Sequence, residues 1–95
     1  LELRLNNTAL AGTLPTQLGN LTNLKYLYVD CNKWAGTLPT ELGKLTSLLG
    51  LRLDNNSLTG PLPTQLGDLT NLEYLYVASN KLTRTLPTEL GKLTS

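Results

Sequence analysis

The sequence contains no histidine, no phenylalanine and no methionine, and it has a single cysteine, Cys31, and a single tryptophan, Trp34. Without histidine the chain lacks the usual general base and the commonest metal ligand of proteins. One cysteine can build neither a disulfide framework nor a thiolate metal cage. We therefore expect no enzymatic activity, no cofactor and no metal site.

Charge and long apolar runs are also scarce. Only 16% of the 95 residues are charged, and eight basic against seven acidic side chains leave a formal net charge of +1. A nucleic-acid-binding protein usually carries a concentrated basic surface, and a membrane-spanning helix needs about 18 or more consecutive apolar residues. The sequence has neither feature. We therefore expect no nucleic-acid partner and no insertion of this segment into a membrane.

A repeat with a period of 24 residues organises the whole chain. The dipeptide Leu-Pro recurs at this step, and a threonine and a Leu-Gly pair follow it in register each time. The four dipeptides are Leu14-Pro15, Leu38-Pro39, Leu62-Pro63 and Leu86-Pro87. Residues 1–47 also resemble residues 49–95, as a duplicated two-repeat block would. Residues 1–95 are therefore predicted to form a single domain, an array of four 24-residue coils with no linker.

The hydrophobic period changes within each repeat. Leu27-Tyr28-Val29 alternates with period two, which predicts a short strand. A Gly-x-Leu-Pro segment then indicates a turn and a short extended piece. Leu42 and Leu45 follow three residues apart, and because Gly43 interrupts this stretch we expect one 3₁₀ or helical turn instead of a long helix. One such coil cannot bury its apolar face alone, whereas stacked coils can.

One complete repeat reads Leu24-x-x-Leu27-x-Val29-x-x-Asn32-x-Trp34-x-Gly36-x-Leu38-Pro39-x-x-Leu42-Gly43-x-Leu45. This run resembles the plant-type subclass of leucine-rich repeats, which is known from receptor-like kinases and polygalacturonase-inhibiting proteins. The resemblance implies an α/β repeat, mostly β with 3₁₀ turns, wound as a right-handed solenoid with a parallel sheet on its concave face. It also implies a place in a larger secreted or cell-surface protein. The sequence departs from the pattern at Thr8, where asparagine is expected, and at Arg84, where glycine is expected.

Residues 24 apart should form columns, because adjacent coils stack at the strand spacing of about 4.8 Å. Three apolar columns predict the core. They consist of Leu3, Leu27, Leu51 and Leu75, of Leu5, Val29, Leu53 and Val77, and of Leu10, Trp34, Leu58 and Leu82. Trp34 is either an enlarged core residue or an exposed aromatic anchor, and the leucines in its column favour the core.

Two further columns predict features of the backbone. The asparagine side chain both donates and accepts, so a column of asparagines can satisfy turn groups in its own coil and the next. This structural ladder consists of Asn32, Asn56 and Asn80. Glycines in register are expected at positive φ or at a close backbone approach, and they are Gly12, Gly36 and Gly60. Thr8 can replace only part of an asparagine, and Arg84 in the glycine column predicts a strained or differently bent turn.

The outward-facing residues of the predicted sheet do not pack in the core, and together they line a continuous surface. They carry all four tyrosines together with arginines, the residue types most enriched at binding hot spots. We therefore predict a contact surface for a protein or peptide ligand, formed by Arg4, Tyr26, Tyr28, Asp30, Arg52, Asp54, Tyr74 and Tyr76. The alternative is a surface that satisfies itself through cation–π contacts and ion pairs of Arg52.

Asp30 and Asp54 should lie close together, one coil apart. Two carboxylates about 5 Å apart can serve a retaining glycosidase, and carboxylates can also form a weak cation site. An open sheet, however, supplies neither an enclosed pocket nor a third ligand. We therefore expect mutual repulsion that Arg52 relieves. Cys31, in the neighbouring column, is expected to be a partly exposed thiol without a catalytic role.

Three N-x-[ST] sequons occur in the chain, and they begin at Asn6, Asn20 and Asn55. A glycan on Asn6 or Asn55 would obstruct the predicted contact surface. Asn20 lies on the opposite side of the predicted coil and is the candidate for glycosylation.

The sequence is compatible with three functions. The first is a recognition module for a protein or peptide, extracellular or at the cell surface by resemblance. The second is a structural array without a specific ligand. The third is ice binding through stacked threonines, which are Thr13, Thr37 and Thr85, then Thr16, Thr40, Thr64 and Thr88. We also expect the array to belong to a longer solenoid, with neighbouring repeats as partners, because its end coils would expose leucines that inner coils cover.

Overall fold

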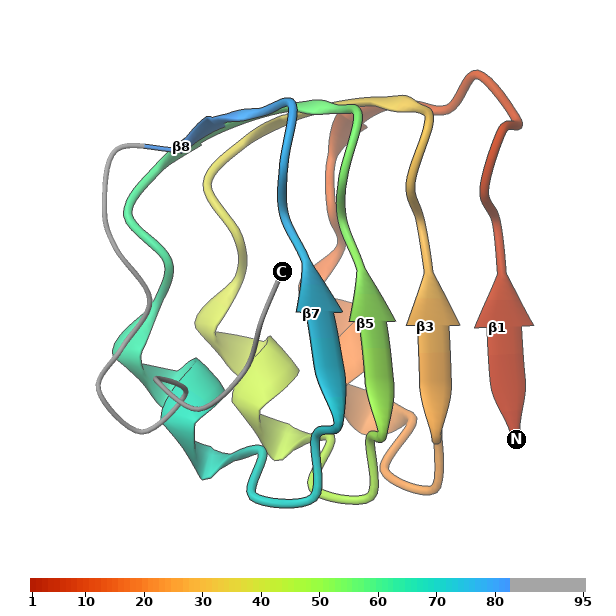
Figure 1. The fold of residues 1–95 in the computed structure, drawn as a ribbon, viewed down its shortest axis with the longest axis vertical. Helices are drawn as coiled ribbons and strands as arrows, with labels where there is room; N and C mark the ends of the chain where they lie inside the picture. Colours follow the sequence, from red (N-terminus) through yellow and green to blue (C-terminus); the bar gives the residue numbers. More distant parts are fainter. Residues whose placement is uncertain (83–95) are drawn as a thin grey trace.

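The chain winds through repeated units of two strands and one 3₁₀ helix in the computed structural model, which describes residues 1–82 (Figure 1). The first strand of each unit joins one sheet, and these strands are β1 (Glu2–Arg4), β3 (Tyr26–Tyr28), β5 (Gly50–Arg52) and β7 (Tyr74–Tyr76). The second strands are β2 (Ala11–Thr13), β4 (Lys33–Gly36), β6 (Ser57–Gly60) and β8 (Lys81–Leu82). The helices are η1 (Thr16–Asn20), η2 (Thr40–Lys44) and η3 (Thr64–Asp68). The expectations for Arg84, Thr85 and Thr88 lie outside the described residues.

Both sheets are parallel, and their order follows the chain. The first sheet has the order β1-β3-β5-β7 and the second the order β2-β4-β6-β8. In the first sheet each strand pairs in steps of 24 residues, so that Leu27 lies opposite both Leu3 and Leu51. The predicted columns are confirmed for this sheet, and the fold is the predicted right-handed solenoid with a parallel sheet on its concave face.

The second sheet was not predicted by the sequence analysis, which assigned to each coil one strand, a turn with a short extended piece after it, and a helical turn. The chain turns at Asn32 and then extends again as β4, whose first amide, that of Lys33, donates to the carbonyl of Leu10 at 2.7 Å. Only one residue of β4, Trp34, is buried, and exposed or half-buried residues flank it. A strand with a single buried residue carries too little alternation to be read from its sequence.

Leucines fill the space between the two sheets and the helices. Leu27, Leu51 and Leu75 of the first sheet are fully buried. Trp34 is also buried, which confirms its interpretation as a core residue. Leu3 and Leu5 are only partly buried, because a single neighbouring coil packs against the first one.

The glycine column shows why a side chain is disfavoured there. Gly12, Gly36 and Gly60 have φ values of 97°, 75° and 76°, which confirms the predicted positive φ. A Cβ atom at Gly36 would also lie 3.1 Å from the methyl carbon of Thr13, and one at Gly60 would lie 2.8 Å from the methyl carbon of Thr37. Gly36 and Gly60 therefore each leave room for the threonine methyl group of the preceding coil, whereas a Cβ atom at Gly12 would meet nothing.

Candidate functional site

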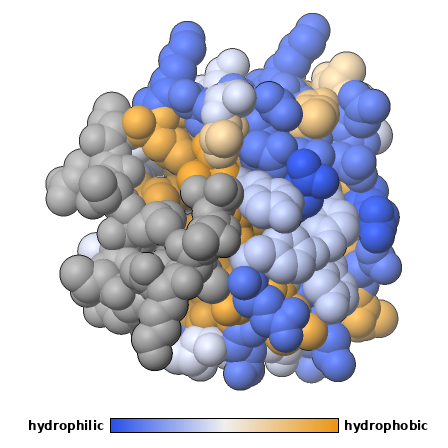
Figure 2. Space-filling model, in the orientation of Figure 1, coloured by the Kyte–Doolittle hydropathy of each residue, from blue (hydrophilic) through white to orange (hydrophobic). Residues whose placement is uncertain are grey.

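The outward side of the first sheet carries aromatic and basic side chains from all four strands. Strand alternation turns Leu3, Leu27, Leu51 and Leu75 inward, so the residues on either side of each leucine point away from the core. We call the surface formed by Arg4, Tyr26, Tyr28, Arg52, Tyr74 and Tyr76 the tyrosine–arginine face. Figure 2 views the molecule from this side and shows a mainly hydrophilic surface over the strands of the first sheet.

Arginines stack on tyrosines of the next strand. The guanidinium carbon of Arg4 lies 4.9 Å from the ring centroid of Tyr28, and that of Arg52 lies 4.9 Å from the ring centroid of Tyr76. Both distances fall within the range of a cation–π contact. A hydrogen bond with Glu2 also raises the pKa of Arg4. The contacts expected for a self-satisfied surface are therefore present, but Tyr76 keeps 39% of its surface exposed.

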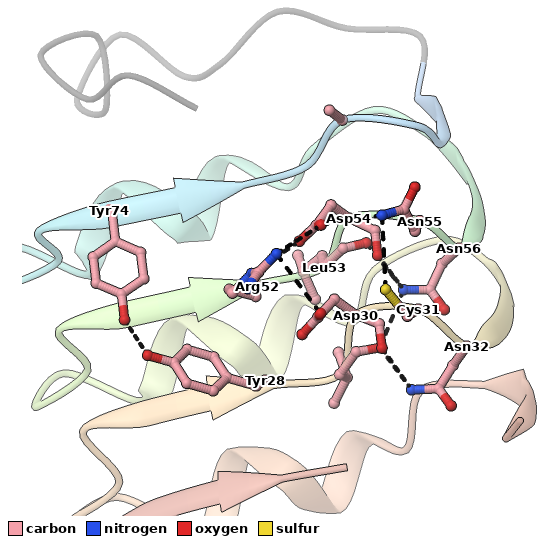
Figure 3. Close-up of polar contacts among 12 residues, drawn as sticks. Tyr28, Asp30, Cys31, Asn32, Arg52, Leu53, Asp54, Asn55, Asn56 and Tyr74 are labelled. Atoms are coloured by element: carbon pink, nitrogen blue, oxygen red, sulfur yellow. Dashed lines mark hydrogen bonds and ion pairs between the residues drawn. The ribbon is translucent and has the colours of Figure 1, made fainter. Parts of the chain in front are cut away.

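Tyr74 leans across the sheet towards Tyr28, which lies two strands away. Their hydroxyl groups form a hydrogen bond (Figure 3). Gly50, on the strand between them, makes this possible, because a Cβ atom at that position would collide with the Tyr74 ring. Burial raises the pKa of Tyr74, and the hydrogen bond with Tyr28 raises it further.

Arg52 forms an ion-paired cluster with two carboxylates at the end of the first sheet (Figure 3). Its Nη2 donates to Oδ2 of Asp54 at 3.0 Å and its Nε donates to Oδ1 at 3.3 Å, which is a two-pronged pairing. The same Nη2 lies 3.7 Å from Oδ2 of Asp30, a distance of ion pairing beyond hydrogen-bond range. The hydrogen bond with Asp54 raises the pKa of Arg52.

The two carboxylates are less accessible than the column pattern predicts. Asp30 is 4% exposed and Asp54 is 8% exposed. In residues 1–82, Oδ1 of Asp30 has no hydrogen-bond partner. Both side chains are therefore buried beneath the surface of the sheet, and their part in binding a partner stays a prediction. In the absence of a partner, Asp30 and Asp54 hold the guanidinium of Arg52 in place.

The asparagines at the end of the first strands connect neighbouring coils. The Nδ2 atom of Asn56 donates to the carbonyls of Val29, Leu53 and Asp54, while its Oδ1 accepts from the amide of Trp34. Asn32 and Asn80 make equivalent contacts (Figure 3 shows Asn32 and Asn56). These side chains thus serve the turn in their own coil and in the preceding one.

Thr8 occupies the asparagine position of the first turn and makes different contacts. Its hydroxyl donates to the carbonyl of Leu5 at 2.7 Å, and its amide donates to Oδ1 of Asn32 at 3.0 Å. Ala9, which follows it, has a φ of 57°, although Lys33 and Ser57 at the corresponding positions of later coils do not share this conformation. The first turn therefore departs from the others at Thr8, as the sequence indicates.

The remaining sequence candidates lie apart from the tyrosine–arginine face or at its margin. Cys31 is an exposed free thiol that accepts a contact from Nδ2 of Asn55 at 3.7 Å. Asn20 is exposed at the end of η1, which lies behind the first sheet in Figure 1. Within residues 1–82, no three histidine, cysteine, aspartate or glutamate side chains gather closely enough to hold a metal ion. No helix of this part of the chain has the length and apolar character needed to cross a bilayer.

Solved structures with the same architecture include ectodomains and receptors of plants. The BIR2 ectodomain from Arabidopsis thaliana superposes with a TM-score of 0.87 at 33% identity, covering 96% of this chain and 50% of its own length. The plant peptide hormone receptor RGFR1, in complex with RGF2, superposes with a TM-score of 0.85 at 35% identity, covering 97% of this chain and 14% of its own.

A plant ice-binding protein is a third similar structure, with a TM-score of 0.80 at 34% identity, covering 90% of this chain and 28% of its own length. The chain therefore spans half or less of each of these proteins. No curated protein sequence matches it significantly. The family described as leucine-rich repeat region matches residues 2–95. The chain belongs to the leucine-rich repeat family, in its plant-type form.

Proposed function

We propose that the chain is a non-catalytic recognition module that binds a protein or peptide on the tyrosine–arginine face. The observation that carries the proposal is the line formed by Tyr28, Arg52 and Tyr76, which are register partners on three adjacent parallel strands. The line is about 10 Å long, as two steps of strand spacing require. That length matches a compact cluster of anchor residues in a protein interface.

The chemistry of this line suits macromolecular recognition. A tyrosine presents a large, rigid surface at low entropic cost, and its hydroxyl can orient a partner. The ion pairs with Asp54 and Asp30 fix Arg52 beside the exposed ring of Tyr76, so little rotamer entropy remains to be lost on binding. The similarity to a plant peptide hormone receptor and to the BIR2 ectodomain supports a peptide or protein partner and an extracellular setting.

The proposal can be tested without a known partner. A random peptide library displayed on phage would be selected on the wild-type chain, and the enriched peptides would be titrated against variants by calorimetry. Tyr28→Ala or Tyr76→Ala should each weaken binding by about 1–3 kcal/mol. Thr40→Ala and Thr64→Ala are matched controls, because both threonines are exposed at the start of helices on the other side of the coil.

Affinity that survives both tyrosine substitutions and falls with the threonine substitutions would place binding on the helical side instead. Failure to select any peptide that discriminates the wild type from the tyrosine variants would favour the structural array without a specific ligand.

Ice binding is a second candidate, favoured by the similarity to a plant ice-binding protein. Thr13 and Thr37 are exposed beside the second sheet, and their methyl groups occupy the side on which a Cβ atom of Gly36 or Gly60 would lie. Pro61 takes the third place in this row. An ice-recrystallisation assay decides the matter, because ice binding predicts that Thr13→Ala and Thr37→Ala reduce inhibition while Tyr76→Ala does not.

A further inference from the structure

We propose that Tyr28 and Tyr74 form a site of oxidative cross-linking, at which hydrogen peroxide and a haem peroxidase join the two phenol rings through a carbon–carbon bond. The two hydroxyl groups already meet in a hydrogen bond on the outer side of the first sheet (Figure 3). Tyr28 lies on β3 and Tyr74 on β7, and strand β5 runs between them. The cross-link would therefore tie three successive coils together covalently.

One of the carbon atoms that would form the bond lies where the two side chains meet. Oxidative coupling of phenols joins carbons that are ortho to the hydroxyl group, which in tyrosine are the Cε atoms. The Tyr74 atoms nearest to the position of a Cβ atom on Gly50 are Cζ, the hydroxyl oxygen and Cε2. The hydroxyl end of the ring and one ortho carbon thus lie above Gly50, on the side towards Tyr28. No side chain of Gly50 stands between the two rings.

Neighbouring side chains hold both rings in this arrangement. The guanidinium carbon of Arg4 lies 4.9 Å from the ring centroid of Tyr28, and the ring centroids of Tyr74 and Tyr76 are 5.4 Å apart. Tyr28 and Tyr74 are also half-buried, which limits the rotamers open to them. Two reacting groups that are held together react as one molecule, and they couple much faster than the same groups meeting in solution.

The other neighbouring tyrosine pairs are less suited to coupling. Tyr26 and Tyr28 share strand β3 with ring centroids 6.2 Å apart, and Tyr74 and Tyr76 share strand β7. Residues two apart on a strand project side by side from one face, and in residues 1–82 no hydrogen bond joins the hydroxyl groups of either pair. Tyr76, at 39% exposure, is the tyrosine most open to coupling between molecules.

The reaction removes one hydrogen atom from each phenol. The peroxidase passes these two electrons and two protons to hydrogen peroxide, which is reduced to two molecules of water. Each ring becomes a phenoxyl radical whose unpaired electron is partly on the ortho carbons. A carbon–carbon bond forms between one Cε of Tyr28 and one Cε of Tyr74. Each of these carbons then loses its proton, and each phenol oxygen regains one, which restores both aromatic rings.

The test treats the dilute folded chain with a haem peroxidase and hydrogen peroxide. Cys31 would be alkylated first, because an exposed thiol also reacts with oxidants. Monomers would be separated from cross-linked dimers under denaturing conditions and digested with trypsin. Trypsin cleaves after lysine and arginine, so Tyr28 falls in peptide 26–33 and Tyr74 in peptide 53–81.

Mass spectrometry of the monomer should find peptides 26–33 and 53–81 joined, with two hydrogen atoms fewer than the separate peptides together. Coupling within the pair Tyr26 and Tyr28, or within the pair Tyr74 and Tyr76, would leave the peptides separate. If a tyrosine-containing reference peptide couples in the same reaction and the joined species is absent from the monomer, the proposal is overturned.

Three variants identify the residues that react. Tyr74→Phe should abolish the joined species, and Tyr26→Phe is the matched control that should retain it. Gly50→Ala should lower its yield roughly fivefold or more, because the added methyl group displaces the Tyr74 ring from its contact. A joined species of undiminished yield in Tyr74→Phe would show that Tyr76 reacts instead, which also overturns the proposal.

A second measurement tests the tie between coils. The cross-linked monomer should unfold at a urea concentration higher by about 1 M or more than the untreated chain, because a link between residues 46 apart restricts the unfolded state. Tyr74→Phe, treated in the same way, should show no such increase. An unchanged midpoint for the cross-linked wild type would overturn the role of the bond as a tie. Neither experiment depends on what the tyrosine–arginine face binds.

Discussion

The hydroxyl of Tyr74 forms a hydrogen bond with that of Tyr28, although 46 residues and one intervening strand separate the two. The bond ties the first strands of three successive coils together on the outer side of the sheet. Most contacts in a solenoid join only adjacent repeats. This tie is therefore an exception to the nearest-neighbour pattern, and it depends on Gly50 having no side chain.

Alkaline titration of stability should report the raised pKa of Tyr74. Its folded pKa is raised by burial and by the bond with Tyr28, while an unfolded tyrosine has a pKa of about 10. The protonated phenol of Tyr74 therefore contributes its full share of the free energy of unfolding below about pH 10. This contribution is lost as the pH rises through the pKa of Tyr74 in the folded protein. Above pH 10, the free energy of unfolding should fall more steeply for the wild type than for Tyr74→Phe. The check is denaturant unfolding across this pH range, and equal slopes would contradict it.

Gly50→Ala should break the bond between Tyr28 and Tyr74. The added methyl group collides with the end of a flexible side chain, so the Tyr74 ring should rotate away instead of the strand moving. In a Tyr74→Ala background the same substitution meets no ring and should stabilise the strand by about 0.5–1 kcal/mol, because alanine loses less backbone entropy than glycine. A double-mutant cycle measures the difference, and purely additive effects would show that the two positions are not coupled.

Leu51→Ala should be more damaging than any single substitution on the tyrosine–arginine face. Leu51 is fully buried and pairs with Leu27 on one side and Leu75 on the other. The cavity should cost about 2–5 kcal/mol of unfolding free energy. Tyr76→Ala, as the exposed control, should cost less than about 1 kcal/mol. The measurement is equilibrium denaturation in urea. Equal free energies of unfolding for the two variants would show that the column assignment is wrong.

Asn56→Ala should destabilise the chain by about 1–3 kcal/mol, because it leaves the Trp34 amide without its side-chain acceptor. The carbonyls of Val29 and Leu53 lose one donor but keep Nδ2 of Asn32 and Nδ2 of Asn80, respectively. Asn56→Asp retains an acceptor for the Trp34 amide but loses the donor to the carbonyls. We therefore expect it to recover only part of the loss. Thermal unfolding of the three proteins at pH 7 gives this ranking, and a cost for Asn56→Ala below about 0.5 kcal/mol would mean that solvent replaces the ladder.

The 24-residue period predicts the solenoid, the inward leucines and the positive-φ glycines, because each follows from one residue type repeated in register. The second sheet escapes prediction, since β4 buries only Trp34 and its pairing is carried by backbone groups. The role of Gly43 is also hidden in the sequence. A Cβ atom there would lie 2.7 Å from the carbonyl oxygen of Gln65, so this glycine lets neighbouring helices approach closely as well as keeping each helix short.

The candidate site is predicted less completely than the fold. Columns place Tyr28, Arg52 and Tyr76 correctly on one line, because register alone determines their positions. They do not predict the hydrogen bond between Tyr28 and Tyr74, because these residues belong to different columns. The only sign of it in the sequence is Gly50, which leaves room for the Tyr74 ring. Nor do the columns predict the burial of Asp30, because a column shows on which side of the coil a residue lies but not how closely its neighbours pack around it.

Trp34 gives this protein a built-in optical probe of its interior. It is the only tryptophan, it is buried on β4 between β2 and β6, and its indole N–H has no hydrogen-bond partner in the described part of the chain. An indole kept from water emits at shorter wavelength, so its emission reports whether the first three coils remain stacked. Circular dichroism averages over every coil. The two signals should coincide if the array unfolds as a unit, and dichroism should change first if the coils at the β7 end fray.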